Sequence, residues 1–297
     1  MNEDAYLEDI LALAEAEGYA AAYDKLFKAL PGFPAPSPQV LYFLACLAGG
    51  AGKDAEALRW LAEAIEHKGY WYRPEVLEDG DLESLFENPE FLRLKALSAE
   101  RCRLAQKEAV PRFTWKEKAA DTLLIALHGN SQCTETALSD WAALGANGVQ
   151  LEAVQSHIVD SYGRYRWNYD GENYRDLSAA VESVADEGYD QLVLAGFSAG
   201  CDMILRSVLF AGVKPNLILL QSPWIPITDT KLDDVAAAVQ KTGAEVRIFC
   251  GELDEDCCPM AERLFYALGS AFVNASFYRQ RGLHHQFPAQ LGSEYRI

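Results

Sequence analysis

The feature that most constrains the fold is a change of pattern near residue 112. Beyond it, short apolar runs alternate with stretches of helical periodicity. The runs are Thr122–Leu127, Val149–Val154, Gln191–Ala195, Leu217–Leu220, Val246–Cys250 and Ala275–Tyr278. Helical patterns lie between them, near 134–144, 172–187, 199–211, 231–242 and 259–269. Strands that alternate with helices predict an α/β fold, with a mostly parallel sheet and helices on both of its faces.

Residues 1 to about 107 show helical patterns only. Apolar residues recur at spacings of three and four, as in Leu7, Ile10, Leu11 and Ala14. Prolines between 31 and 38 separate one helical pattern from the next. The chain of 297 residues is long enough for two domains. We therefore expect an all-α domain at 1–107 and an α/β domain at 112–297, divided near Pro111.

The helical part also contains a segment with a recognisable pattern. Residues 53–94 resemble a tetratricopeptide repeat followed by a short helix, with D-x-D-L-x-x-L-x-x-x-P-x-F running from Asp79 to Phe91. The resemblance covers about residues 4–97 and implies a stack of helices of the kind that binds peptides or a protein partner. The alternative is a packing domain that only shields the catalytic half or mediates its self-association.

Composition argues against several classes of function. A formal net charge of −18 disfavours binding to nucleic acid and to anionic membrane surfaces. The longest apolar runs have about five to seven residues, whereas a membrane-spanning helix needs roughly 20. The acidic start MNEDAYLEDI does not resemble a secretory signal, and an odd number of cysteines, 7, suits reduced thiols. These features predict a cytoplasmic protein, and no cysteine spacing resembles a zinc site.

The G-F-S-A-G motif at 196–200 carries the strongest chemical signal. It lies between the predicted strand at 191–195 and the predicted helix at 199–211, which is the setting of a nucleophile elbow. The tight turn strains the serine backbone, and glycine on either side leaves room for neighbouring main chain. The hydroxyl then projects above the sheet at the positive end of the following helix. Ser198 is the predicted nucleophile.

A serine hydroxyl needs a base to remove its proton, and the base needs an acid to orient it. Among the 5 histidines, His284 and His285 follow the last predicted strand. A group of carboxylates at 252–256 follows the strand at 246–250. Because parallel strands end at the same edge of a sheet, these loops should meet near Ser198. The expected chain order is serine, acid, histidine.

The segments LLIALHGN, LAGFSAG, FCGELDEDCCP and GLHHQFP make residues 120–290 resemble the α/β-hydrolase superfamily. The likeness is strongest to its carboxylesterase and lysophospholipase branch, which includes relatives of dienelactone hydrolase. It implies that the aspartate of G-x-x-D, Asp254, is the acid and that the histidine of G-x-x-H, His285, is the base. Pro259 lies one residue further from Asp254 than the usual pattern places it, so Asp256 is the alternative acid.

Hydrolysis also requires donors for the negative charge that develops on the attacked carbonyl oxygen. The amide of Ala199, the residue after the nucleophile, is one predicted donor. The loop at 128–131, after the strand at 122–127, should supply the other. The resemblance implies that this donor is the amide of Asn130 and that His128 orders the loop by hydrogen bonds.

Candidate substrate contacts lie in two further loops. The aromatic-rich segment 155–171 follows the strand at 149–154 and is expected to hang over the site. Some related esterases have a Q-S-S-Q stretch followed by a tryptophan here, which implies roles for Gln155 and Trp167, with Tyr165 in the same aromatic wall. Trp224 is expected on the opposite side. Alternatively, these side chains only cover the edge of the sheet.

The sequence therefore predicts a serine hydrolase that cleaves a carboxylic ester of a small-molecule substrate by acyl transfer. No metal or organic cofactor is expected. A peptidase, thioesterase or lysophospholipase could use the same residues, because specificity depends on the pockets. A non-catalytic adaptor that uses the helical repeat is a further alternative, against which the retention of all three catalytic residue types argues.

Overall fold

A computed structural model of the chain describes residues 3–33, 35–146 and 148–297. The chain divides into two compact units. The helical unit comprises Met1–Glu108 and Val159–Gly163, and the sheet unit comprises Ala109–Ile158 and Arg164–Ile297. Among the helices of the described residues, none is long and apolar enough to cross a membrane.

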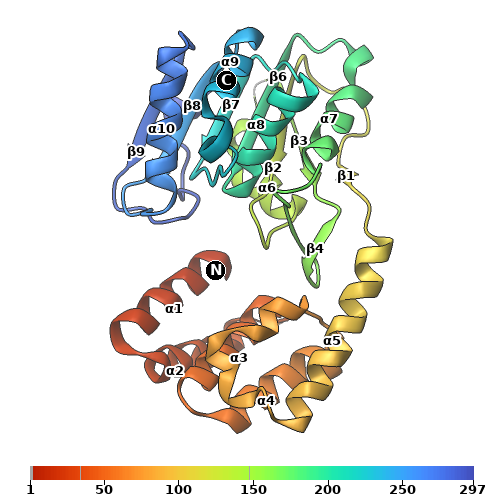
Figure 1. Ribbon diagram of the computed structural model, residues 1–297, viewed down its shortest axis with the longest axis vertical. Helices are drawn as coiled ribbons and strands as arrows, with labels where there is room; N and C mark the ends of the chain where they lie inside the picture. Colours follow the sequence, from red (N-terminus) through yellow and green to blue (C-terminus); the bar gives the residue numbers. More distant parts are fainter. Residues whose placement is uncertain (1–2, 34, 147) are drawn as a thin grey trace. The chain divides into compact units, whose positions relative to one another are not determined.

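Among the described residues, the helical unit contains five α-helices (Figure 1). The helices are α1 (Glu3–Glu17), α2 (Tyr19–Ala29), α3 (Pro38–Gly50), α4 (Asp54–Ala62) and α5 (Pro89–Glu108). Tighter or wider turns occupy Leu30–Gly32, Glu63–His67, Pro74–Glu78 and Gly80–Leu85. Helices that follow one another pack together, α1 on α2, α2 on α3 and α3 on α4. The predicted helical character of this region is thus confirmed.

Helix α3 lies at the centre of this unit, and its sequence explains why. Pro38 occupies the first turn, where a missing N–H costs nothing, and the Ser37 hydroxyl accepts hydrogen bonds from the amides of Gln39 and Val40. Leu41, Leu44, Leu47 and other apolar side chains along the helix are buried. Because α3 is apolar on most of its faces, neighbouring helices cover it on several sides.

A short segment from far along the chain completes the helical unit. Residues 159–163 hydrogen-bond to the stretch before α5: the Tyr162 amide donates to the Trp71 carbonyl at 2.9 Å, and Tyr72 and Ser161 form an antiparallel bridge. Arg73 Nε lies 2.7 Å from Oδ1 of Asp160, whose side chain is almost fully buried. Part of the segment 155–171, residues 159–163, thus belongs to the helical unit.

The sheet unit is built around seven strands in the order β1-β3-β2-β6-β7-β8-β9. The strands are β1 (Arg112–Phe113), β2 (Thr122–Leu127), β3 (Val149–Gln155), β6 (Gln191–Phe197), β7 (Leu217–Gln221), β8 (Glu245–Gly251) and β9 (Ala275–Gln280). Within the described residues of this sheet, β1 pairs antiparallel with β3, and the other neighbouring strands pair parallel. The strands β4 (Ile158–Ser161) and β5 (Arg164–Arg166) form a separate two-stranded sheet.

Helices cover both faces of the seven-stranded sheet. They are α6 (Thr134–Asp140), α7 (Tyr174–Ser183), α8 (Ala199–Ala211), α9 (Thr228–Thr242) and α10 (Cys257–Ser270), with 3₁₀ turns at Ala142–Leu144, Ala185–Glu187 and Ser293–Tyr295. Alternate residues of each strand point to opposite faces. Leu123, Ile125 and Leu127 of β2 join the core under α7 to α10, whereas Leu124 and Ala126 join the core under α6.

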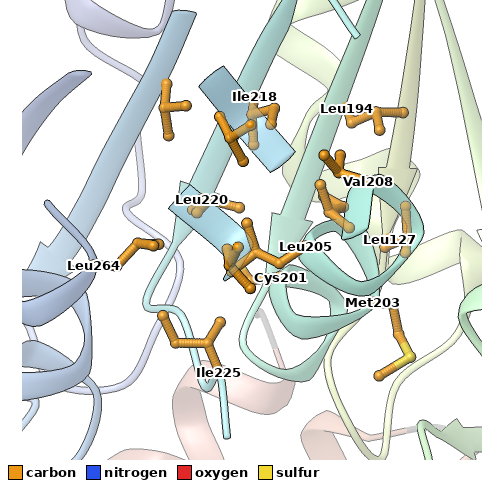
Figure 2. Close-up of a cluster of buried hydrophobic side chains, with 14 of the residues drawn as sticks. Leu127, Leu194, Cys201, Met203, Leu205, Val208, Ile218, Leu220, Ile225 and Leu264 are labelled. Atoms are coloured by element: carbon orange, nitrogen blue, oxygen red, sulfur yellow. The ribbon is translucent and has the colours of Figure 1, made fainter. Parts of the chain in front are cut away.

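Figure 2 shows the larger of these two cores. Leu127, Leu194, Ile218 and Leu220 project from the strands toward α8, which contributes side chains such as Leu205. Because the strands are buried on both faces, they appear in the sequence as continuous apolar runs, as expected for a parallel sheet. The predicted α/β fold with helices on both faces is confirmed, and each predicted strand lies within one of the strands observed.

Candidate active site

Ser198 occupies the sharp turn between β6 and α8. Its backbone has φ 51° and ψ −121°, in the left-handed half of conformational space that non-glycine residues rarely adopt. A Cβ at Gly196 would lie 2.8 Å from the Cys201 nitrogen, and one at Gly200 would lie 2.7 Å from the His128 carbonyl oxygen. Glycine at both positions is therefore needed for the main chain to pass this closely. The turn has the strained geometry that the sequence predicts.

His285 lies between Ser198 and Asp254 in a continuous chain of hydrogen bonds. Its Nε2 is 2.9 Å from the Ser198 Oγ, and its Nδ1 is 2.8 Å from Oδ2 of Asp254. The three residues come from the turn after β6, the loop after β8 and the loop after β9. The arrangement matches the relation between a nucleophile, a base and an orienting acid.

Main-chain hydrogen bonds join the loop that carries Asp254 to the loop that carries His285. The Leu253 amide donates to the Leu283 carbonyl at 2.8 Å, and the Glu252 amide donates to the Gln280 carbonyl at 2.9 Å. A Cβ at Gly251 would lie only 2.3 Å from the Leu283 carbonyl oxygen, so the absence of a side chain there permits the approach. These main-chain contacts hold the loops of Asp254 and His285 close together.

Asp254 is buried, and its environment favours the charged carboxylate. Burial by itself raises the pKa of Asp254, but hydrogen bonds from His285 and from the Cys257 amide outweigh it, and the pKa is lowered overall. The Cys257 amide donates to Oδ1 at 3.1 Å. An ionised carboxylate beside Nδ1 stabilises the imidazolium that forms when His285 takes a proton.

The structure distinguishes Asp254 from Asp256, and His285 from His284, by their burial and hydrogen bonds. Asp254 is 4% exposed and bonds to His285, whereas Asp256 is exposed at the start of α10. His284 is also exposed, and His285 is the histidine whose ring meets Ser198. Asp254 is therefore the carboxylate that lies next to His285, and it remains the candidate acid.

The loop after β2 approaches Ser198 and has its own supports. Asn130 Oδ1 accepts a hydrogen bond from the Trp167 amide at 2.8 Å, and its Nδ2 donates to the Tyr169 hydroxyl at 2.9 Å. The Gly129 amide donates to Oε1 of Gln132 at 2.8 Å. Ala199 is the first residue of α8, where backbone amides have no partner within the helix. The amides of Asn130 and Ala199 are the candidate oxyanion donors.

His128 lies at the start of this loop and is fully buried. Its Nδ1 lies 2.6 Å from the Gly129 carbonyl oxygen, and its Nε2 accepts a hydrogen bond from the Ser156 amide at 3.3 Å. Burial lowers the pKa of His128 to about 4, so the ring is neutral at neutral pH. These contacts agree with an ordering role for His128.

The predicted substrate contacts have different surroundings. Trp167 is 1% exposed, stacks on His128 and donates from Nε1 to the His128 carbonyl at 2.8 Å, so it supports the loop after β2. Gln155 is buried and accepts hydrogen bonds from Thr134 at the start of α6. Neither side chain is exposed enough to form much of a substrate wall.

Tyr165 and Trp224 remain accessible candidates. Tyr165 is half-buried, and its amide donates to the Gln132 carbonyl at 2.8 Å, next to the oxyanion loop. Trp224 is half-buried, and its amide donates to the Ser198 carbonyl at 3.3 Å. Tyr169, which the sequence analysis did not single out, lies against Asn130 and belongs with them.

Two further residues near the site were missed. Gln221 lies at the end of β7, and its carbonyl oxygen accepts a hydrogen bond from the Ser198 amide at 3.0 Å. Its side chain donates to the carbonyl of Gln286, next to His285 in the chain. Cys257 places its Sγ 3.4 Å from Nδ1 of His285. Gln221 ends a strand and Cys257 follows the group of carboxylates at 252–256, but their contacts join residues that are far apart in the chain.

Comparisons with known proteins agree with this architecture. The family described as the A/B hydrolase-like N-terminal domain matches residues 2–106. An uncharacterized protein from Bacillus cereus ATCC 10987 is 24% identical over 97% of this chain and 94% of that chain, with a TM-score of 0.54. The Bacillus cereus carboxylesterase is 19% identical over 63% of this chain and 92% of its own, with a TM-score of 0.47. No curated protein matches.

The full-length similarity to the Bacillus cereus protein and the family match, together with the strand order, show an α/β-hydrolase fold preceded by a helical domain. The family match is confined to the N-terminal region, residues 2–106. The tetratricopeptide resemblance of that region is not confirmed.

Proposed function

We propose that this protein is a serine hydrolase that cleaves a carboxylic ester by acyl transfer. The observation that carries the proposal is the hydrogen-bonded series Ser198–His285–Asp254, with Nε2 of His285 2.9 Å from the serine Oγ. This distance is within reach of direct proton transfer. The strained turn at Ser198 and the positive end of α8 beneath it add further support.

The proposed reaction has two halves. Ser198 Oγ attacks the ester carbonyl while Nε2 of His285 accepts its proton, and the protonated imidazole then gives that proton to the departing alcohol. In the second half, water gives a proton to His285 and attacks the acyl-serine. This step releases the carboxylic acid product and restores Ser198. Asp254 keeps Nδ1 protonated and stabilises the positive charge of the ring. The amides of Asn130 and Ala199 hold the oxyanion in both halves.

Small or accessible substrates are the proposed class. Tyr165 and Trp224, half-buried near the oxyanion loop and Ser198, would contact the acyl or alcohol group. A buried Trp167 would contribute indirectly, by holding Asn130 in place. The helical unit would serve as a surface for a protein partner or for self-association.

Covalent labelling with a fluorophosphonate tests the proposal. Wild-type protein should be labelled at Ser198, because an activated hydroxyl attacks phosphorus as it attacks a carbonyl carbon. Ser198→Ala should abolish labelling with the fold intact, as judged by circular dichroism. Labelling that persisted in the alanine variant would contradict the assignment. A chain-length series of p-nitrophenyl esters would then define the acyl preference.

Thioesters, peptides and lysophospholipids are alternative substrates for the same residues. Matched substrates would separate these activities: an ester and a thioester of one acyl group, a peptide amide, and a lysophospholipid. The ester should have the highest kcat/KM. Absence of both labelling and hydrolysis in well-folded protein would favour the non-catalytic adaptor.

A further inference from the structure

Three side chains around the Nδ1 edge of His285 form a compact group of different metal-binding atoms. Oδ2 of Asp254 lies 2.8 Å and Sγ of Cys257 lies 3.4 Å from Nδ1 of His285. One ligand atom from each residue lies within 4.8 Å of the others. Asp254 and Cys257 are 4% and 1% exposed. A thiol and a carboxyl thus lie close to the imidazole of the proposed base.

This combination of atoms suits a thiophilic divalent cation. Zinc binds cysteine sulfur, histidine nitrogen and carboxylate oxygen at about 2.0–2.3 Å in tetrahedral geometry, which places its ligands roughly 3–4 Å apart. Hard cations such as Mg²⁺ prefer oxygen alone. Three protein ligands also leave a fourth position for water. Cys250, whose Sγ lies 3.7 Å from Oδ2 of Asp254, adds a second sulfur close to the group.

We propose that Asp254, Cys257 and His285 form an inhibitory binding site for a thiophilic divalent cation such as Zn²⁺. The inference rests on the proposed function, because it assigns His285 as the base. It adds a ligand and a means of control that ester hydrolysis itself does not need.

The chemistry of binding explains why the bound form is inactive. The cation bonds to Nδ1 of His285, where the ring otherwise carries the proton that it donates to Asp254. That proton moves to Nε2, the thiol of Cys257 loses its proton to solvent as the sulfur–metal bond forms, and no electron is transferred. An imidazole with hydrogen on Nε2 has no lone pair facing Ser198, so it cannot accept the serine proton.

Titration of the full-length protein with Zn²⁺ during hydrolysis of a p-nitrophenyl ester tests the inference. Activity should fall as Zn²⁺ rises and return when EDTA is added. Cys257→Ala should raise the concentration for half-inhibition roughly tenfold or more, relative to its own metal-free activity, because a ligand is lost. Cys258→Ala, which removes the adjacent buried thiol, is the matched control and should leave that concentration unchanged. Equal inhibition of wild type and Cys257→Ala would overturn the inference.

A second measurement is independent of catalysis. Cd²⁺ added to the Ser198→Ala protein should produce ultraviolet absorption from a thiolate–metal bond, and Cys257→Ala in the same background should remove most of it. If Cys257→Ala folds poorly, Cys257→Ser replaces it in both experiments. An absorption change that does not depend on Cys257 would overturn the inference. Metal-free wild type without ester hydrolysis would contradict the proposed function instead, and the Cd²⁺ experiment would still decide the site.

Discussion

The amide of Ser198 donates a hydrogen bond to the carbonyl oxygen of Gln221 at 3.0 Å, so the nucleophile turn is tied to the end of the neighbouring strand β7. The side chain of Gln221 donates from Nε2 to the carbonyl of Gln286 at 3.3 Å, next to His285 in the chain. A single buried residue thus connects the loop of the proposed nucleophile with the loop of the proposed base.

The orientation of the Gln221 amide depends on the C-terminal segment, which gives the first prediction. Tyr295 donates from its hydroxyl to Oε1 of Gln221 at 2.5 Å and stacks on Phe249. Tyr295→Phe should lower kcat roughly fivefold with KM nearly unchanged, because losing one buried hydrogen bond costs about 1 kcal/mol. Steady-state kinetics on an ester measures this. Tyr278→Phe, which also stacks on Phe249, is the control and should behave as wild type.

The second prediction concerns the acid. Asp254→Asn should keep the fold but lower kcat by roughly ten-thousandfold, because the amide favours the wrong tautomer of His285 and cannot stabilise its charge. Asp256→Asn, in the same loop but exposed, should lose less than about twofold. Steady-state kinetics measure kcat of both variants, and thermal melts show whether their fold is retained. A larger loss in the Asp256 variant would place the acid there.

The third prediction distinguishes the adjacent histidines. His285→Ala should reduce kcat by roughly a thousandfold or more, since Ser198 would lack its base. His284→Ala should have little effect, because that ring is exposed. The rate of fluorophosphonate labelling provides an independent measure and should follow the same order. The reverse ranking would refute the role of His285.

The fourth prediction concerns stability and pH. The pKa of His128 is lowered to about 4 in the folded protein, against an ordinary value of 6.5, so the unfolded chain binds the proton more tightly. The corresponding stabilisation is complete above about pH 6.5 and is lost as the pH falls toward about 4. The free energy of unfolding from urea titrations should decline over this window.

A substitution isolates this contribution. His128→Gln cannot acquire the charge, so its free energy of unfolding should depend less steeply on pH between about 6.5 and 4. His67→Gln, at an exposed position of the helical unit, is the control and should keep the wild-type slope. An unchanged slope in the His128 variant would show that other groups cause the acid sensitivity.

Much of the fold could be predicted from the sequence because its signals are local. The strands β2 and β6 are buried on both faces and appear as the uninterrupted runs that begin at Thr122 and Gln191. The turn at Ser198 is recognisable because glycine is the residue that fits at 196 and 200. By contrast, β1 and β5 have two and three residues, too few for a period-two pattern.

The supporting contacts could not be predicted, because they depend on which distant residues meet. Trp167 looks like a substrate contact when only its aromatic neighbours in the sequence are known. Its burial against His128 is a property of the folded loop. The same applies to Tyr295, whose hydroxyl donates a hydrogen bond to Gln221, a residue far away in the sequence. Residue type indicates chemistry, but burial and partners decide whether a side chain can meet a substrate.

The placement of residues 159–163 in the helical unit limits how the two units can be recombined during evolution. Because this segment belongs to the helical unit while the residues on either side of it belong to the sheet unit, no single break in the chain yields two complete units. Recombination at a boundary near 108 would separate Arg73 from Asp160 and leave a buried carboxylate without that ion pair. A crossover there would exchange an incomplete module, so the two units are expected to have been passed on and diversified together.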